Sequence, residues 1–256
     1  MAETILSVKE LSIGYDTKAV ANNINFKLEQ GGLCAIVGVN GIGKSTLLRT
    51  IAGLQRPLSG AVTIRDTELS QFRSAQLAKE IAVVLTDPIA TKNLTVIELV
   101  ALGRQPYTNW LGQLSAKDQE AVEACLQTFE LLPLKNQKCF ELSDGQLQRV
   151  LIAKAMAQDT PLIILDEPTT HLDLAHKVAI FKALQQLAHA HGKTIVFTTH
   201  EINLAIQLCD FTLLLNGQDN PFGSPCELIE KGCFSKLFPE DVVTFDAKSG
   251  VFRVIK

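Results

Sequence analysis

The sequence lacks a long apolar run, a surplus of basic residues and a recognisable leader segment. Its apolar stretches, such as 162–165 and 195–197, are far shorter than the roughly 20 residues of a membrane-spanning helix. The 24 Lys and Arg residues are matched by 27 Asp and Glu residues, which argues against a nucleic-acid binder that works by bulk charge. The opening residues, MAETILSVKE, show no basic segment followed by an apolar one, so we expect no signal peptide.

Paired cysteines are also absent. None of the six cysteines forms a C-x-x-C pair or lies near a histidine at metal-ligand spacing, so neither a metal site nor a disulfide framework is indicated. Their scatter is typical of buried or incidental thiols in a reducing compartment. We therefore expect a cytoplasmic protein that reaches a membrane only through a partner.

The sequence does contain alternating strand and helix patterns, and 46% of its residues are apolar. Two runs of alternating apolar and polar residues, 5–15 and 19–28, predict antiparallel strands. Later apolar runs are interleaved with helical patterns, which predicts an α/β fold with a mostly parallel sheet covered on both faces. These runs begin at residues 33, 81, 162, 194 and 211.

Between residues 95 and 158 the pattern becomes helical, with apolar residues three and four apart. No linker separates this stretch from the rest. We therefore expect one compact unit over 1–256, with a core of 1–92 and 159–256 and a helical subdomain of 93–158. The final segment predicts a hairpin that turns at 248–250.

The first chemical motif is a glycine-rich turn between a predicted strand and a predicted helix. Residues 38–46 read GVNGIGKST, which fits the phosphate-loop pattern G-x-x-x-x-G-K-[ST] in full. Glycines let backbone N–H groups surround phosphates, Lys44 can reach the β and γ oxygens, and the Ser45 hydroxyl can hold Mg²⁺. The alternative is a chance glycine-rich turn, which the flanking strand and helix disfavour. The candidate nucleotide-binding residues are Gly38, Asn40, Gly41, Gly43, Lys44, Ser45 and Thr46.

Two later strands end in residues suited to hydrolysis. The run LIILDEP ends in Asp166 and Glu167, of which Asp166 would support Mg²⁺ through water and Glu167 would polarise the attacking water. The run TIVFTTH ends in His200, which at this edge of a parallel sheet would lie near the γ-phosphate. Exposed acids and a structural histidine are the alternatives. Asp173 is a milder candidate that would also cap the helix following it.

Tyr15 and the stretch ELSDGQLQR (141–149) are two further candidates. Tyr15 either stacks on adenine, a contact worth about 1–3 kcal/mol, or is an ordinary strand aromatic, and spacing alone does not decide. The stretch predicts a helix start with Ser143 as N-cap and Gly145 and Gln146 in the first turn. Such a helix end suits an anion, although the phosphate loop lies far earlier in the chain.

In this order, GVNGIGKST, LSDGQ, LIILDEP, HLD and TTH resemble the motifs of the ATP-binding subunits of ABC transporters, over nearly the whole chain. The resemblance implies a P-loop NTPase (RecA-like) core with an antiparallel β subdomain and an inserted helical subdomain. It implies ATP and Mg²⁺ as ligands and Tyr15 as the adenine-stacking aromatic. Lys44, Glu167 and His200 would be the catalytic residues.

The same resemblance implies partners. Two ATP-binding subunits, expected to be identical, would face each other head to tail, so that the signature of one serves the nucleotide of the other. The cross-dimer residues would be Ser143, Gly145, Gln146 and Asp173. Hydrolysis would let the subunits part and thereby drive a transmembrane permease that holds them at the inner face of the cell membrane. No nucleic-acid partner is expected.

Residues 98–122 carry a finer resemblance. They include GRQPY, similar to a G-R-x-P-aromatic segment in the ATPases of importers for iron–siderophores, haem and cobalamin. This region would lie beside the groove that receives the permease, unless Tyr107 and Trp110 merely pack the subdomain. The other readings are an exporter or lipid-extraction ATPase, a soluble non-transport ABC ATPase, and a nucleotide-binding regulator without turnover. Intact Glu167 and His200 argue against the regulator.

Two positions depart from the family pattern. Thr86 stands where the family usually has a glutamine that contacts Mg²⁺ and links the site to the permease groove. Its shorter side chain would reach the metal only through water, so we expect slower basal hydrolysis, with Asp87 assisting. Asp144 stands in the signature where glycine is most common. Because a carboxylate near a partner's γ-phosphate is repulsive, we expect Asp144 to face solvent or cap its own helix.

Overall fold

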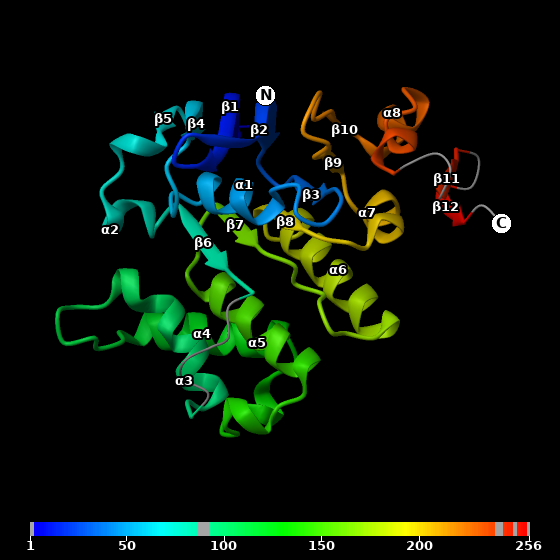
Figure 1. The fold of residues 1–256 in the computed structure, drawn as a ribbon. Helices are drawn as coiled ribbons and strands as arrows, with labels where there is room; N and C mark the ends of the chain where they lie inside the picture. Colours follow the sequence, from blue (N-terminus) through cyan, green and yellow to red (C-terminus); the bar gives the residue numbers. More distant parts are fainter. Residues whose placement is uncertain (1–2, 87–92, 239–242, 248–249, 255–256) are drawn as a thin grey trace.

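The fold consists of three layers: an antiparallel sheet, a central parallel sheet and a group of helices (Figure 1). It is described by a computed structural model for residues 3–86, 93–238, 243–247 and 250–254. Asp87, which the sequence suggested as an assistant to Thr86, lies outside these residues. The layering matches the predicted α/β core with an antiparallel β part and a helical part.

The N-terminal strands form the antiparallel sheet, in the order β2-β1-β4-β5. Val8 on the central strand β1 pairs with Phe26 on β2 and with Val62 on β4. The two antiparallel strands predicted from alternating residues are therefore confirmed. The strand bounds are β1 Thr4–Tyr15, β2 Lys18–Glu29, β4 Ser59–Ile64 and β5 Thr67–Glu68.

The central sheet has the order β10-β9-β3-β8-β7-β6. Neighbours from β9 to β6 pair in parallel, whereas β10 pairs antiparallel with β9. This confirms the mostly parallel sheet. Its strands are β3 Leu33–Val37, β6 Ile81–Val84, β7 Leu162–Leu165, β8 Thr194–Thr198, β9 Phe211–Leu214 and β10 Phe222–Gly223.

Both faces of the central sheet are buried, as β3 illustrates. Ala35 and Val37 pack in the apolar cluster that includes helices α5 and α6, while Cys34 and Ile36 pack in the cluster shared with α1 and the antiparallel sheet. Successive side chains of a strand point to opposite faces, so a strand covered on both sides needs an uninterrupted apolar run. Burial of both sheet faces therefore explains the short, uninterrupted apolar runs of the sequence.

Helices lie on both sides of the central sheet, with α3, α4 and α5 grouped together (Figure 1). Among the helices of the described ranges, none combines the length and apolar content that a bilayer crossing requires. The α-helices are α1 Lys44–Ile51, α2 Ser74–Leu77, α3 Val96–Ala101, α4 Ala116–Thr128, α5 Asp144–Ala157, α6 Leu174–His189, α7 Ile202–Leu208 and α8 Pro225–Glu230. Short 3-10 turns are η1 Leu69–Gln71, η2 Leu102–Tyr107, η3 Leu132–Leu134, η4 Cys139–Glu141 and η5 Phe234–Leu237.

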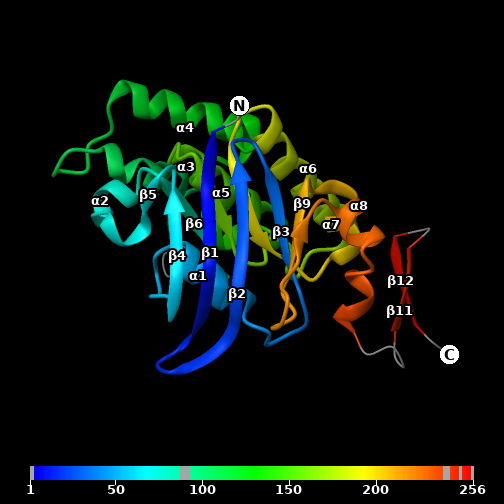
Figure 2. The same cartoon turned by 90° about the horizontal axis from the view of Figure 1, so that it is seen from above.

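The predicted terminal hairpin is also present. Strands β11 Val243–Asp246 and β12 Val251–Val254 pair antiparallel, on the opposite side of the molecule from α3 and α4 (Figure 2). Two residues of the predicted turn, 248 and 249, lie outside the described residues. The phenyl rings of Phe245 and Phe234 stack at 5.2 Å and attach the hairpin to η5.

A buried ion pair joins the pieces of the helical part. Arg104 on η2 donates from Nε to Asp118 Oδ1 on α4 at 2.8 Å, and from a terminal nitrogen to the carbonyl of Ala157 on α5 at 2.9 Å. The Ser115 hydroxyl donates to the second Asp118 oxygen at 2.6 Å. Hydrogen bonds from Ser115, followed by those from Arg104, hold the pKa of Asp118 below its ordinary value.

The GRQPY segment thus has a structural role for part of its length. The Arg104 guanidinium lies 4.0 Å from the centre of the Tyr107 ring, a cation–π contact that packs this tyrosine on the helical part. Trp110 is 91% exposed. Packing of the subdomain therefore accounts for Tyr107 and not for Trp110.

Replacing Asp118 with alanine is expected to lower the free energy of unfolding by on the order of 3 kcal/mol, because the buried Arg104 loses its carboxylate. The matched control is Lys138→Ala, since Lys138 forms an exposed pair with Glu98 at 4.0 Å and should contribute less than about 1 kcal/mol. Denaturant unfolding at neutral pH measures both. Because the pKa of Asp118 is lowered by folding, its stabilisation exists above the unfolded pKa and disappears as the pH falls through the folded value. Equal losses in the two variants would contradict the buried role.

Candidate nucleotide-binding and hydrolysis site

The predicted phosphate loop lies between β3 and α1, at the carboxyl edge of the central sheet. Gly41 and Gly43 have φ angles of +78° and +104°, in the region that L-residues with side chains avoid. A Cβ on Gly43 would also lie 2.6 Å from Val20 Cγ1. The loop therefore needs glycine at these positions, and it leads directly into the N-terminus of α1, where backbone N–H groups favour an anion.

Lys44 is held across this loop. It is 6% exposed, and its ammonium group donates to the carbonyls of Gly38 at 2.9 Å and Val39 at 3.2 Å. Burial lowers the pKa of Lys44 from its ordinary value, and the charges of Glu167 and Asp166 oppose that shift. The cation is therefore positioned over the loop, between the phosphate-binding backbone and the acid pair.

The structure brings the acid pair to the phosphate loop. Asp166 follows β7 directly, is 4% exposed, and accepts a hydrogen bond at its Oδ1 from the Ser45 hydroxyl at 3.1 Å. A serine hydroxyl and a carboxylate are hard oxygen donors of the kind that Mg²⁺ takes when nucleotide phosphates supply further ligands. The residues predicted to hold Mg²⁺, Ser45 and Asp166, are thus adjacent and chemically suited to it.

Glu167 and His200 also meet, from the ends of neighbouring strands. His200 Nε2 lies 2.5 Å from Glu167 Oε1, and the Thr170 hydroxyl donates to the other Glu167 oxygen at 3.1 Å. Glu167 has a φ of +47°, a left-handed conformation that a non-glycine residue adopts only when its surroundings enforce it. The carboxylate is therefore oriented by two side chains and by an unusual backbone.

Thr198, the last residue of β8, contacts both acids and was not predicted from the sequence. Its hydroxyl donates to Asp166 Oδ1 at 2.6 Å and accepts from the Glu167 backbone N–H at 2.8 Å. The signal available in the sequence was the threonine that ends the run TIVFT, directly after three apolar residues. Only the pairing of β8 with β7 shows what that threonine touches.

A pocket of about 520 Å³ collects most of the predicted nucleotide-binding residues. Tyr15 is 57% exposed, and its hydroxyl is 3.2 Å from Thr46 Oγ1, so its ring is anchored at one end and open for stacking. Gly38 is not part of the pocket lining; it packs against Leu215, whose carbonyl would lie 2.4 Å from a Cβ at this position. The lining residues are Tyr15, Val20, Asn40, Gly41, Gly43, Lys44, Ser45, Thr46, Glu167 and His200.

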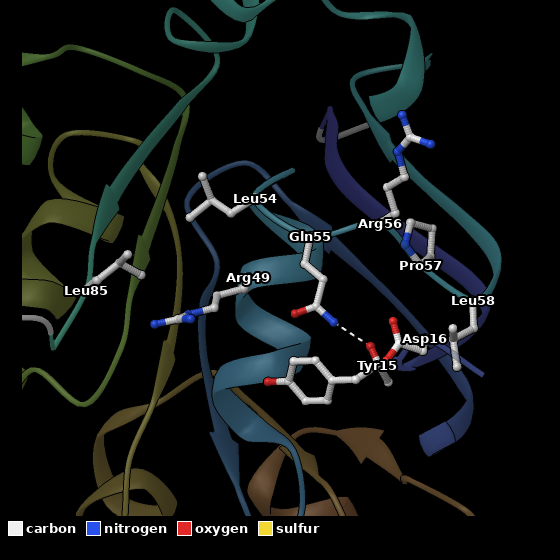
Figure 3. A pocket seen from close by; sticks show the side chains of 10 residues that line it. Tyr15, Asp16, Arg49, Leu54, Gln55, Arg56, Pro57, Leu58 and Leu85 are labelled. Carbon is white, nitrogen blue, oxygen red and sulfur yellow. Dashed lines mark hydrogen bonds between the residues drawn. The ribbon is translucent and has the colours of Figure 1, made fainter. Parts of the chain in front are cut away.

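A second pocket, of about 670 Å³, shares Tyr15 with the phosphate pocket as a lining residue (Figure 3). Gln55 donates to the Gly14 carbonyl at 2.5 Å and closes one wall, and Arg49 extends from α1 toward Leu85. Thr86, the next residue, is exposed and lies outside the lining of the phosphate pocket. Its role toward Mg²⁺ stays a prediction.

The signature forms the predicted helix start. Ser143 caps α5 by accepting from the Gln146 N–H at 3.3 Å, and Gln146 Oε1 accepts from the Ser143 N–H at 2.9 Å. Asp144 is exposed in the first turn, as expected for a carboxylate that faces solvent near a helix N-terminus. None of the signature residues lines the phosphate pocket in the described part of the chain.

The starts of α5 and α6 lie against each other. Asp173 caps α6 by accepting from the His176 N–H at 2.9 Å, and the His176 ring is 2.8 Å from the same oxygen. A Cβ on Gly145 would lie 3.0 Å from this ring. Asp173 therefore serves as the predicted helix cap, and a side chain at position 145 would press against the imidazole.

Comparison with known proteins agrees with this geometry. Residues 21–170 match the ABC transporter family. The chain is 37% identical over 239 residues to the achromobactin transport ATP-binding protein CbrD of Dickeya dadantii, covering 93% of this chain and 89% of that protein. It is 33% identical over 237 residues to the iron(3+)-hydroxamate import ATP-binding protein FhuC of Bacillus subtilis, covering 92% and 88%.

Among solved structures, a metal-chelate type ABC transporter in an inward-facing conformation matches with a TM-score of 0.82. The sequence identity is 30%, and the match covers 98% of this chain and 97% of that one. The fold predicted from the motif order is thus confirmed. The chain belongs to the ABC transporter family, as one of its ATP-binding subunits that hydrolyse ATP.

Proposed function

We propose that this ATPase powers the import of a metal chelate, with an iron–siderophore favoured over haem and cobalamin. The observation that carries the ATPase chemistry is the convergence of Ser45, Asp166, Glu167 and His200 beside the phosphate loop. The import assignment is supported by relatives named for iron(3+)-hydroxamate import and achromobactin transport. The GRQPY segment, which resembles the G-R-x-P-aromatic segment of such importers, also supports the import assignment.

In the proposed mechanism the chain's own residues bind and orient the reactants. The loop glycines and Lys44 would hold the phosphate chain, Tyr15 would stack on adenine, and Ser45 and Asp166 would hold Mg²⁺. The metal ion would neutralise phosphate charge. Glu167 accepts the proton of the attacking water, and His200, paired with it at 2.5 Å, fixes the carboxylate and contacts the γ-phosphate.

The signature residues would act in a partner's site. Ser143, Gly145, Gln146 and Asp173 lie outside the phosphate pocket of their own chain, while the N-terminus of α5 offers free N–H groups to an anion. A head-to-tail pair of identical subunits would bring each signature to the other's nucleotide. ATP would then hold the pair together until hydrolysis removes the γ-phosphate contacts.

The permease would dock on the pocket shown in Figure 3. Leu54 and Leu85 supply apolar surface there, and Leu85 adjoins Thr86, the position linked to the groove in this family. Exposed Trp110 on the helical part is a second contact for the same partner. The chain would accordingly be cytoplasmic and lie at the inner face of the membrane. An exporter ATPase is the competing function, and the identity of the permease distinguishes the two.

Replacing Glu167 with glutamine should reduce ATP turnover by about 100-fold or more, because the amide cannot accept the proton of the attacking water. ATP binding should persist, and the variant should form a stable dimer with ATP. Phosphate release and size-exclusion chromatography with ATP measure the two effects. Glu230→Gln, at an exposed position on α8, is the control. Turnover of Glu167→Gln equal to that of this control would remove Glu167 from the chemistry.

The identity of the membrane protein that co-purifies with this chain tests the import assignment. Affinity-tagged Glu167→Gln protein, isolated from native membranes with ATP, should carry a polytopic permease of the metal-chelate importer type, because the blocked hydrolysis keeps the assembly closed. The same isolation with the Lys44→Ala variant, which cannot hold the phosphates, provides the background. Mass spectrometry identifies the proteins. A permease fused to export machinery, or only soluble proteins, would refute import.

A further inference from the structure

Thr198 is a polar residue buried directly beneath the acid pair. It ends β8, is wholly buried at 0% exposure, and pairs with Ile36 of the neighbouring strand β3. Alternate β8 residues face opposite sides of the sheet, so Thr198 shares the face of Val196, whose cluster includes Leu47 and Leu48 of α1. Its side chain thus lies on the face from which Ser45 approaches Asp166.

The Thr198 hydroxyl is fully used by the two acids. A hydroxyl has one proton to donate and lone pairs to accept with. The proton goes to Asp166 Oδ1 at 2.6 Å, and the oxygen accepts from the Glu167 N–H at 2.8 Å. One side chain therefore contacts the carboxylate of the first acid and the backbone of the second.

These hydrogen bonds orient the carboxylate of Asp166 and the backbone of Glu167. Asp166 Oδ1 also accepts from Ser45 at 3.1 Å, so the shorter bond from Thr198 is the firmer of its two attachments. The bond to the Glu167 N–H anchors a residue whose φ of +47° is unfavourable for any residue but glycine. That anchoring aims the Glu167 side chain at His200, 2.5 Å away.

We propose that Thr198 is a positioning residue for ATP hydrolysis, which holds the Asp166 carboxylate toward Ser45 and the Glu167 backbone in its left-handed conformation. It does not line the phosphate pocket, so it acts through the two acids. This rests on the roles proposed for Asp166 and Glu167.

The chain offers a matched comparison in β9. Thr212 is also 0% exposed, and in the described residues its hydroxyl makes no hydrogen bond. Replacing either threonine with valine keeps the volume and removes the hydroxyl. The difference between the two variants isolates the hydrogen bonds of Thr198 from the general effect of a buried substitution.

The experiment measures kcat and KM for ATP with the purified full chain. Thr198→Val should lower kcat about 10- to 100-fold, the effect of losing a hydrogen bond to a charged group, while KM stays within about twofold. Thr198→Ser, which restores the hydroxyl, should return kcat to within about threefold of wild type. Thr212→Val should match wild type.

Two further measurements separate positioning from folding. Thermal unfolding identifies any variant that is not native, and Thr198→Ala gives a second removal of the hydroxyl if the valine variant does not fold. Binding of a fluorescent ATP analogue in EDTA should be unchanged in Thr198→Val, because the phosphate loop is intact.

A kcat of Thr198→Val equal to that of Thr212→Val would overturn the proposal, as would a serine variant as slow as the valine variant. A raised KM with unchanged kcat would assign Thr198 to binding instead and would also overturn it. The turnover of Glu167→Gln tests the proposed site itself. The ratio of kcat between Thr198→Val and Thr212→Val tests only the role of Thr198.

Discussion

The carboxylate of Asp166 is the point at which the phosphate loop, strand β7 and strand β8 meet. Its Oδ1 accepts from Ser45 of the loop helix and from Thr198 of β8, and it sits almost without exposure between them. A buried carboxylate is tolerated only when hydrogen bonds and nearby cations compensate for lost hydration. The two hydroxyls and Lys44 supply this compensation, so the carboxylate ties the start of α1 to the ends of β7 and β8.

In the proposed head-to-tail pair, the same arrangement would give each chain half of a complete site. The phosphate pocket contains the loop, Tyr15, Glu167 and His200, whereas the capped start of α5 lies elsewhere and is packed against the His176 ring of α6.

Motif spacing was enough to predict the phosphate loop, the acid pair, His200 and the caps at Ser143 and Asp173, because each depends on residues close together in the chain. Other contacts could not be predicted, because they depend on strand register and on helix packing between distant segments, which no local pattern encodes. They are those of Thr198, Val20 and the Arg104–Asp118 pair. The sequence left open whether Trp110 packs the subdomain or lies beside the permease groove, and its exposure shows that packing does not cover it.

The most direct test of the composite site is to mix two inactive variants. Lys44→Ala removes the phosphate contact but keeps the signature, and Ser143→Arg blocks the signature but keeps the phosphate loop. Either variant alone builds a dimer with two faulty sites, whereas a mixed dimer contains one intact site formed from both chains. The account predicts that the equimolar mixture hydrolyses ATP while neither variant alone does. A mixture as inactive as its two components would contradict the cross-dimer role of the signature, and so would a Ser143→Arg variant that retains wild-type turnover on its own.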